Sequence, residues 1–195
     1  GGVDAFPVCL STQDSDEIVK TVKYLEPSFG GINLEDIASP RCFEIERRLN
    51  ECMDIPVFHD DQHGTAIIVL AGLINALKIV KKDIKDVKIV LNGPGAAGTA
   101  IALLLNDYGA ENIVPCDEFG ILYPGRDNME WHKKELAEKF NKNAVKGNLK
   151  DAIKGADVFI GVSKGNLLTP EMIADMNADA IIFAMANPVP EIMPD

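Results

Sequence analysis

The chain has 195 residues, of which 47% are apolar, and this is enough for one large domain or two small domains with a packed core. Its formal net charge of −11 argues against a nucleic-acid partner, because nucleic-acid-binding surfaces need clustered lysine and arginine. No apolar run is long enough to span a bilayer and no signal peptide is visible, so we expect no membrane partner and a cytoplasmic location.

The first part of the chain is expected to contain short strands and amphipathic helices. Residues 3–10 have the composition of a strand, and residues 14–24 have helical spacing with Ser15 as a plausible cap. The remaining elements expected here are strands at 32–34 and 55–58 and helices at 40–53 and 64–80.

From residue 87 onward, strands and helices alternate. The expected strands and helices are, in turn, strands at 87–91, 112–116, 157–162 and 180–186 and helices at 95–108, 129–140, 149–154 and 170–176. This alternation predicts an α/β fold, a Rossmann-like doubly wound parallel sheet with helices on both faces. The charged run that begins at Lys81 suggests a domain boundary between residues 82 and 83.

The four cysteines are expected to be structural. They form no Cys-x-x-Cys pair and lie among apolar neighbours, at Cys9, Cys42, Cys52 and Cys116. We therefore predict buried free thiols in a reduced compartment.

A glycine-rich turn joins the strand at 87–91 to the next helix. Its residues match the pattern G-x-G-x-x-G, namely Gly93, Pro94, Gly95, Ala96, Ala97 and Gly98. Gly93 would permit a tight turn, Gly95 would let the backbone approach a dinucleotide pyrophosphate, and Gly98 would let helix and strand pack closely. The alternative is a tight strand–helix turn that binds no ligand.

An acidic residue follows the next strand, as this type of coenzyme site requires. Asp117 comes 19 residues after Gly98 and could accept hydrogen bonds from the ribose hydroxyls of the adenosine. Its charge would repel a 2′-phosphate, which favours NAD over NADP, although Arg126 is near enough to leave NADP open.

Three further carboxylates, Glu35, Asp36 and Asp61, each follow a short apolar strand. Ligands gather at the carboxyl ends of parallel strands, and several carboxylates meeting there would be costly without a cation. Mg²⁺ or Mn²⁺ is the natural choice, since both prefer oxygen ligands. The alternative is that the acidic residues are solvated or cap the helix near residue 64. We expect His132 to lie on the surface of a polar helix.

Four segments together resemble the malic enzyme family, in its short bacterial type. They are residues 31–37 (GINLEDI), 58–66 (FHDDQHGTA), 92–98 (NGPGAAG) and 186–188 (ANP). The resemblance implies oxidative decarboxylation of malate to pyruvate and CO₂ with reduction of NAD(P). It also implies that residues 1–82 are the metal- and substrate-binding, C-terminal part of the family's N-terminal domain, and that 83–195 are the NAD-binding Rossmann domain.

The resemblance assigns a role to each matching residue. Glu35, Asp36 and Asp61 would hold Mg²⁺ or Mn²⁺, and the metal would bind the C2 hydroxyl and the carboxylate of the substrate. Asp60 would orient and polarise a catalytic lysine, and Asn187 would lie near the nicotinamide ribose or the substrate.

One departure from the family pattern concerns the general acid and base. The family uses a tyrosine and a lysine that belong to segments upstream of the matching part, and Tyr24, Tyr108 and Tyr123 match no such motif. We expect this chain to be a fragment of the enzyme that lacks both termini and is inactive alone. We expect the whole enzyme to form a homodimer or a larger assembly. Two alternatives stay open: a metal-independent amino-acid or hydroxy-acid dehydrogenase domain, and a non-catalytic dinucleotide-binding regulatory domain.

Overall fold

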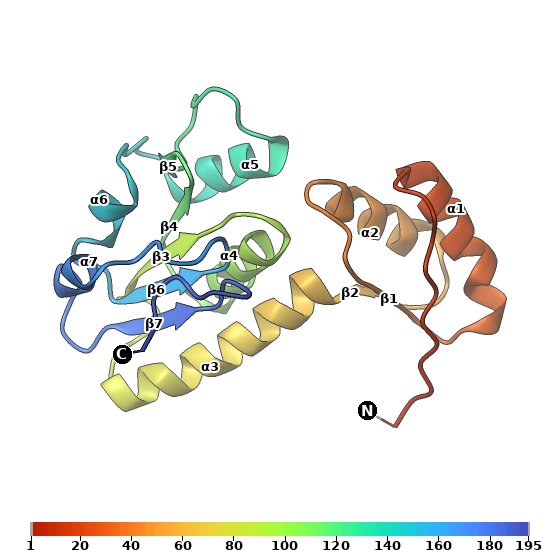
Figure 1. Cartoon of the computed structure of the whole chain (residues 1–195), viewed down its shortest axis with the longest axis horizontal. Coiled ribbons are helices and arrows are strands. Elements are labelled where there is room, and N and C mark those ends of the chain that lie inside the picture. The colour runs from red at the N-terminus through yellow and green to blue at the C-terminus, as the bar shows by residue number, and fades with distance from the viewer. Residues whose placement is uncertain (1, 195) are drawn as a thin grey trace. The chain divides into compact units, whose positions relative to one another are not determined.

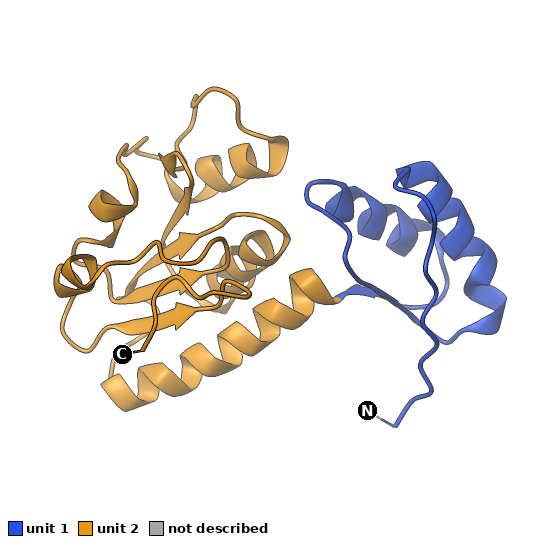
Figure 2. Cartoon of the chain, viewed as in Figure 1, with its two compact units in different colours: residues 1–59 blue, residues 60–195 orange. Residues whose placement is uncertain are grey.

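The computed structural model describes residues 2–194, and the chain divides into two compact units, Gly1–His59 and Asp60–Asp195 (Figures 1 and 2). Each unit is described by itself. The units divide before the predicted boundary at 82–83, because helix α3 (Thr65–Val80) packs against the core of the second unit. The domain boundary itself stays a prediction.

The first unit pairs two helices with a small parallel sheet. Its elements are α1 (Ser15–Leu25), η1 (Glu26–Ser28), β1 (Ile32–Leu34), α2 (Arg41–Cys52) and β2 (Val57–His59). In the sheet, Ile32 pairs with Val57 and Leu34 with His59. The buried faces of α1 and α2 supply Ile18 and Leu49 to the core.

The start of α1 differs from the prediction by one residue. The helix is capped by Asp14, whose side chain accepts hydrogen bonds from the backbone N–H groups of Asp16 and Glu17, each at 2.9 Å. Ser15 is instead the first residue of the helix. Aspartate is an equally good cap, since its carboxylate also interacts favourably with the helix dipole.

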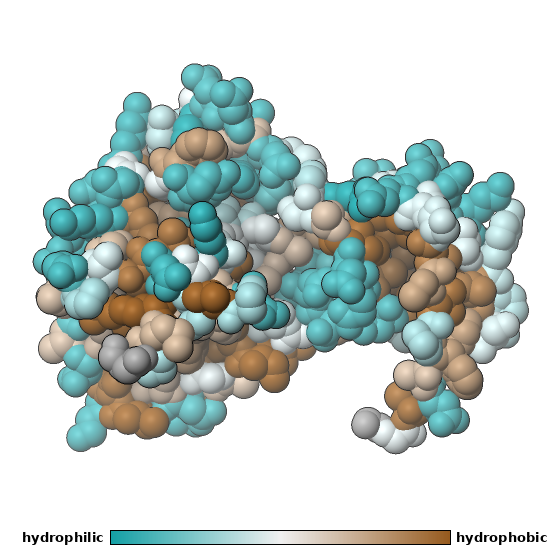
Figure 3. Space-filling view, viewed as in Figure 1, coloured by the Kyte–Doolittle hydropathy of each residue, from teal (hydrophilic) through white to brown (hydrophobic). Residues whose placement is uncertain are grey.

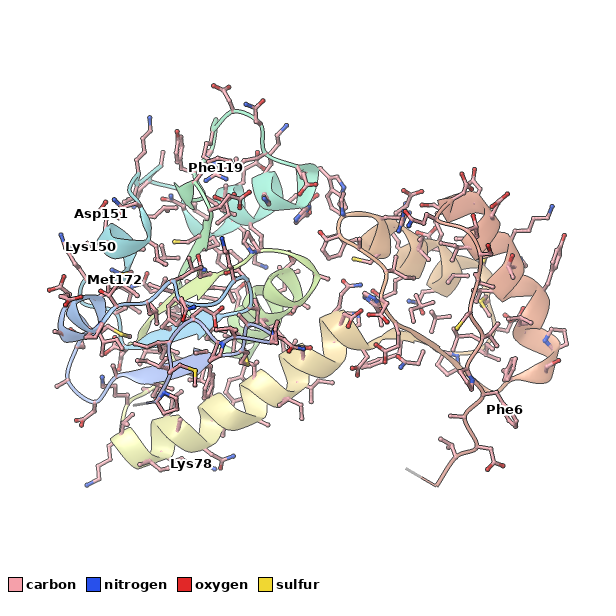
Figure 4. The ribbon with its side chains drawn as sticks, viewed as in Figure 1. Phe6, Lys78, Phe119, Lys150, Asp151 and Met172 are labelled. Atoms are coloured by element: carbon pink, nitrogen blue, oxygen red, sulfur yellow. The ribbon has the colours of Figure 1, made fainter. Side chains whose placement is uncertain are left out.

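The strand predicted at residues 3–10 is wrong. This segment has no regular secondary structure, and Phe6, labelled in Figure 4, is 69% exposed. A strand requires a neighbour for its backbone N–H and C=O groups. Within residues 2–194, β1 and β2 pair only with each other, so the segment has no strand partner.

The second unit is a doubly wound sheet, as predicted. Its elements are η2 (Asp60–Gly64), α3, β3 (Lys88–Asn92), α4 (Ala96–Tyr108), β4 (Asn112–Asp117), β5 (Gly120–Ile121), α5 (Trp131–Phe140), α6 (Leu149–Ile153), β6 (Val158–Gly161), α7 (Pro170–Ala174) and β7 (Ile181–Ala184). The strand order is β5-β4-β3-β6-β7. β4, β3, β6 and β7 are parallel, so the chain reverses its direction of progress across the sheet at β3.

Helices cover both faces of this sheet, and the alternating side chains of β3 pack against both layers. Ile89 and Leu91 face one way and pack with α3 and α4, whereas Val90 faces the other way. On that second face, Val90 packs with Phe159 of β6 and Met172 at α7. The two-residue strand β5, antiparallel to β4, was not predicted, since two residues carry no detectable alternation.

A buried carboxylate holds the amino ends of β3 and β6 together. Asp157 lies just before β6 and accepts hydrogen bonds from Lys82 Nζ (2.9 Å), the Lys88 N–H (2.9 Å) and Asn177 Nδ2 (3.0 Å). Burial alone would raise the pKa of Asp157, but the hydrogen bonds from Lys82, Lys88 and Asn177 hold it below its ordinary value.

One helical stretch, Asp60–Val80, is long and apolar enough to cross a membrane by length and composition alone, contrary to our reading of the sequence. Figure 3 shows brown, hydrophobic surface along the course of α3, and Ile68 and Ile79 on this helix are exposed. The evidence for a membrane is weak, since the core helices of soluble proteins pass the same test and Leu73 and Leu77 pack into the sheet core. The absence of a membrane partner stays a prediction.

All four cysteines are free, but only two are buried. Cys42 and Cys116 are inaccessible, Cys52 is half-buried and Cys9 is exposed, so the expectation of four buried thiols is wrong for two of them. Burial raises the pKa of the Cys116 thiol to about 12. Thiolates are the reactive form, and Cys116 is therefore protected in two ways.

We expect iodoacetamide to alkylate Cys9 first in the native protein, and to leave Cys42 and Cys116 unmodified until the chain unfolds. Peptide mass mapping of native and denatured samples measures this order, with the denatured sample as the control in which all four sites react. Rapid native labelling of Cys116 would contradict the burial described above.

Candidate coenzyme and carboxylate sites

The glycine-rich turn begins where β3 ends. Gly93 has φ of +105°, a conformation that favours glycine, and its N–H donates a hydrogen bond to the carbonyl oxygen of Cys116 at 2.9 Å. A Cβ on Gly93 would lie 2.7 Å from the Cβ of Ser163 and 2.9 Å from the carbonyl carbon of Val162. Both the backbone angle and the neighbouring loop therefore require glycine here.

The other two glycines of the motif have different surroundings. A Cβ on Gly98, which lies inside α4, would collide with the backbone carbonyl of Gly93, so Gly98 permits close packing of helix and turn. Gly95 is the N-cap of α4, provides no side-chain cap, and has no heavy atom within 4 Å of the position that a Cβ would take. The space at Gly95 suits a pyrophosphate that approaches the backbone at the start of a helix.

His132 supports this turn, and the expectation that it is a surface residue is wrong. Its side chain is 2% exposed, and its Nε2 lies 3.0 Å from the carbonyl oxygen of Pro94. Burial lowers the pKa of His132, so the imidazole is neutral at pH 7 and can donate one N–H to that oxygen. The helical spacing of Met129, His132 and Leu136 is the signal that could have placed His132 on the buried face.

Asp117 lies at the carboxyl end of β4, but its carboxylate is already bound within the protein. Its side chain is 2% exposed and accepts two hydrogen bonds from the Arg126 guanidinium, with the Nη1–Oδ1 distance at 2.9 Å, and one from the Phe119 N–H at 3.0 Å. Lys133 Nζ lies 3.4 Å from the same carboxylate. The ribose-binding role of Asp117 stays a prediction.

The charge balance around Asp117 differs from that of an isolated acid. Burial would raise the pKa of Asp117, but the hydrogen bonds from Arg126 and Phe119 and the charges of Arg126 and Lys133 hold it below its usual value. One carboxylate faces two cations here, so the cluster as a whole is cationic. This arrangement weakens the argument that Asp117 repels a 2′-phosphate.

The candidate residues of the second unit line one edge of the sheet. Asp117 is the last residue of β4, Gly93 follows β3, and Asn187 lies exposed in the loop after β7. The order β4-β3-β6-β7 places Asp117 and Asn187 on opposite sides of the turn. Dinucleotides bind across this reversal of strand order, at the carboxyl ends of the strands.

In the first unit, Glu35 and Asp36 directly follow β1. Both are exposed, and Glu35 Oε1 accepts a hydrogen bond from Asn33 Nδ2 at 2.8 Å. Asp36 has φ of +56°, an uncommon backbone conformation for a residue other than glycine. Because Leu34 pairs with His59, the chain leaves β1 and β2 at the same end of the small sheet.

In the second unit, Asp60 and Asp61 begin the π-helical turn η2, which packs against α4. The residue at the N-cap of α3 is Gly64, without a side-chain hydrogen bond, so neither aspartate serves as the cap that we weighed as an alternative. A Cβ on Gly64 would collide with the carboxylate of Asp60, which is therefore folded back over this glycine. π-helical turns are often found at functional sites.

Taken by itself, neither unit gathers three His, Cys, Asp or Glu side chains that could hold a metal, within residues 2–194. The predicted ligands Glu35, Asp36 and Asp61 belong to both units, and they stay a predicted set. Their donor atoms are all carboxylate oxygens, the chemistry that Mg²⁺ and Mn²⁺ prefer.

Two family descriptions match successive parts of the sequence. "Malic enzyme, N-terminal domain" matches residues 9–50, and "Malic enzyme, NAD binding domain" matches residues 62–193, well over half of the chain. The chain belongs to the malic enzyme family. The second match begins inside η2, after Asp60 and Asp61, and covers α3 and all five strands of the doubly wound sheet, including both Asp117 and Asn187.

Individual malic enzymes resemble the whole chain but are longer. The bifunctional malic/malolactic enzyme of Bacillus subtilis (strain 168) is 59% identical over 100% of this chain and 48% of its own length. The NADP-dependent malic enzyme of Rhizobium meliloti (strain 1021) is 50% identical over 99% of this chain and 25% of its own length.

Among solved structures, the NAD-dependent malic enzyme of Thermotoga maritima matches with a TM-score of 0.94 and 52% identity, covering 98% of this chain and 52% of that chain. This chain thus spans about half, or less, of the malic enzymes that it matches.

Proposed function

We propose that this chain provides the coenzyme-binding part and the metal-binding carboxylates of a malic enzyme, which oxidatively decarboxylates malate to pyruvate and CO₂ with reduction of NAD(P). One observation supports this proposal above the others. The turn η2, which carries Asp60 and Asp61, packs directly against α4, the helix that begins at the glycine-rich turn. A metal site and a coenzyme site that lie on two elements packed against each other suit a reaction that needs both.

In this proposal, the glycine-rich turn binds the pyrophosphate at Gly95, where the backbone is open, while Gly93 and Gly98 keep the turn and α4 close together. Asn187 contacts the nicotinamide ribose or the substrate from the loop after β7. Asp60 orients the catalytic lysine of the whole enzyme. Turnover is a property that we propose for the whole enzyme, and we expect this chain alone to bind coenzyme without oxidising malate.

Glu35, Asp36 and Asp61 would hold Mg²⁺ or Mn²⁺. A bound divalent ion supplies Lewis acidity, which stabilises negative charge on the substrate oxygen as CO₂ leaves. The carboxylates themselves fix the ion near the coenzyme, and Asp61 does so from the turn that packs on α4. This division of roles makes Asp61 the residue through which metal and coenzyme binding should be coupled.

NAD is the coenzyme that we propose, with NADP less favoured. The predicted ribose contact of Asp117 supports NAD, whereas the cations Arg126 and Lys133 beside it would tolerate a 2′-phosphate. The assembly into a homodimer or larger oligomer and the cytoplasmic location also stay predictions.

The proposal is tested by titrating the chain with NADH and following nucleotide fluorescence, with and without Mn²⁺. We expect saturable binding that Mn²⁺ tightens, because a bound cation reduces the negative potential around the carboxylates. In Asp61→Asn, NADH should still bind, but Mn²⁺ should no longer tighten it. Loss of a charged ligand typically weakens metal binding, and the depletion of free Mn²⁺ measured by electron paramagnetic resonance reports this loss without the coenzyme.

Asp107→Asn is the matched control, since it makes the same change of charge near the far end of α4, on an exposed residue. It should behave as the wild type. Absence of saturable NADH binding would refute the coenzyme site, and equal Mn²⁺ enhancement in Asp61→Asn would refute the metal assignment alone. A site indifferent to Mn²⁺ in the wild type would favour a plain dinucleotide-binding domain.

A further inference from the structure

A buried glutamate near the end of the described chain has no role in the site outlined so far. Glu191 is 0% exposed and lies beyond Asn187, on the segment that follows β7. We propose that Glu191 is a positioning residue, which fixes the two loops that face the nicotinamide half of the coenzyme. This inference rests on the proposed function, because it presupposes a dinucleotide bound at the carboxyl edge of the sheet.

The carboxylate of Glu191 joins two loops that are distant in sequence. Its Oε1 accepts a hydrogen bond from the Ser163 N–H at 3.1 Å, in the loop after β6. Its Oε2 accepts one from the Ala186 N–H at 3.0 Å, immediately before Asn187. Each oxygen therefore sets the position of one loop, and the rigid carboxylate sets the two loops relative to each other.

The backbone around Glu191 strengthens the same connection. The Leu168 N–H donates to the carbonyl oxygen of Glu191 at 3.0 Å, and the Asn166 N–H donates to that of Pro190 at 3.0 Å. The side chain also fills the space above Gly161 in β6, where a Cβ would collide with it. Glu191 thus occupies a fitted position, and a smaller or reoriented side chain would leave Ser163 and Ala186 without their acceptors.

The loop after β6 is also tied to the glycine-rich turn. Asn92 Nδ2, at the end of β3, donates a hydrogen bond to Ser163 Oγ at 2.7 Å. The Val162 N–H donates to the Asn92 carbonyl oxygen at 3.0 Å. Glu191 is therefore connected through Ser163 to the start of the turn that would hold the pyrophosphate.

The strand order assigns these loops to one half of the coenzyme. If the adenosine lies over β4, where Asp117 is placed, the nicotinamide lies on the other side of β3, over β6 and β7. The loops after β6 and β7 are the ones that Glu191 joins. Its loss should therefore weaken contacts to the nicotinamide and leave contacts to the adenosine in place.

A buried carboxylate is an expensive way to join two loops, since burying a charge is unfavourable unless hydrogen bonds compensate it. A carboxylate has the advantage that both oxygens accept from N–H groups, whereas a glutamine side chain presents one oxygen and one NH₂ donor. In Glu191→Gln, the NH₂ group of the side chain must therefore face the backbone N–H of one of the two loops, and both of these groups are donors. The substitution disturbs one connection and changes the shape of the side chain very little.

The test compares NADH with ADP, which has the adenosine and the pyrophosphate but neither the second ribose nor the nicotinamide, by isothermal titration calorimetry of the chain. We expect Glu191→Gln to raise the dissociation constant of NADH by about tenfold, because the loop arrangement that binds the nicotinamide half loses one hydrogen bond to a charged group and becomes less populated. The dissociation constant of ADP should stay within about twofold of the wild-type value.

Asp157→Asn is the matched control. Asp157 is also a buried acid that accepts a backbone N–H, but it lies at the amino ends of β3 and β6. Asp157→Asn should lower the midpoint of urea unfolding without changing the ratio of the NADH and ADP dissociation constants. A merely structural Glu191 would behave like Asp157 in this experiment.

The outcomes separate this inference from the proposed function. If the wild type binds neither nucleotide, the proposed coenzyme site fails and the inference fails with it. If the wild type binds both, and Glu191→Gln weakens both equally or neither, only the inference is overturned. Should Glu191→Gln fail to fold, as judged by circular dichroism, Glu191→Asp keeps the charge and shortens the side chain by one methylene, and the same selective loss of NADH is expected.

Discussion

Replacing Gly98 with alanine is expected to abolish NADH binding and to lower the free energy of unfolding by about 1–3 kcal/mol, the usual effect of overpacking. The added methyl group would collide with the carbonyl of Gly93, and that carbonyl belongs to rigid backbone. Helix α4 and the glycine-rich turn must then separate, which displaces the N–H groups at the start of α4. NADH fluorescence titration and urea unfolding measure the two effects.

Gly95→Ala is the informative comparison for this substitution. No heavy atom lies within 4 Å of the added methyl group, and φ of −83° is acceptable for alanine. The free energy of unfolding should therefore change by less than about 0.5 kcal/mol. NADH binding should nevertheless weaken, because the methyl group takes space that the pyrophosphate needs. Wild-type NADH binding by Gly98→Ala would show that the turn does not form the coenzyme site.

The second large effect is expected at the buried ion pair of Asp117 and Arg126. Arg126→Met should lower the free energy of unfolding by about 3–5 kcal/mol, because it leaves a buried carboxylate with too few partners. The side chains of Arg126 and Asp117 are only 11% and 2% exposed, so solvent cannot compensate for the loss. The double variant Asp117→Asn/Arg126→Met should be more stable than Arg126→Met alone, since it removes the unpaired charge. Urea unfolding of the single and double variants measures this coupling.

The same pair predicts a pH dependence with a definite sign. The folded-state pKa of Asp117 lies below its unfolded value of about 3.9, so its contribution to stability is complete above that pH. The contribution is lost as the pH falls below about 4 towards the folded-state pKa. The stability advantage of the wild type over the double variant should therefore shrink in that acidic range and stay constant near neutral pH. An advantage that grows on acidification would contradict the ion pair.

The sheet of the second unit was predictable from sequence because each strand carries a local signal. Buried runs such as 89–91 are continuous in hydrophobicity, and a glycine-rich turn follows this one. The segment at 3–10 shows the limit of this reasoning, since it is almost entirely apolar but strand formation depends on a partner strand. β5 could not be predicted because its pairing with β4 comes from a tight turn, not from its own composition.

The candidate site was predictable where a motif has one geometric solution, as in the glycine-rich turn. The structural roles of Arg126 and His132 could not be predicted, because both act through tertiary contacts. Arg126 contacts Asp117, and His132 contacts the Pro94 carbonyl. Glu191 carried no sequence signal, since a charged residue in a proline-rich segment suggests an exposed loop. Its burial follows from the space above Gly161, which only the folded sheet creates.

Gly64 has ordinary helical backbone angles, but a Cβ at this position would be crowded by Asp60. The residues that can occupy position 64 therefore depend on the residue at position 60. Its φ of −61° and ψ of −50° are helical, so the backbone would accept any residue except proline without strain. The Asp60 carboxylate occupies the space of a Cβ there, so any other residue at position 64 would require that carboxylate to move. Over evolutionary time, we expect the two positions to covary in malic enzymes: larger residues at 64 should accompany an altered residue at 60, and an aligned set of sequences would reveal such pairs.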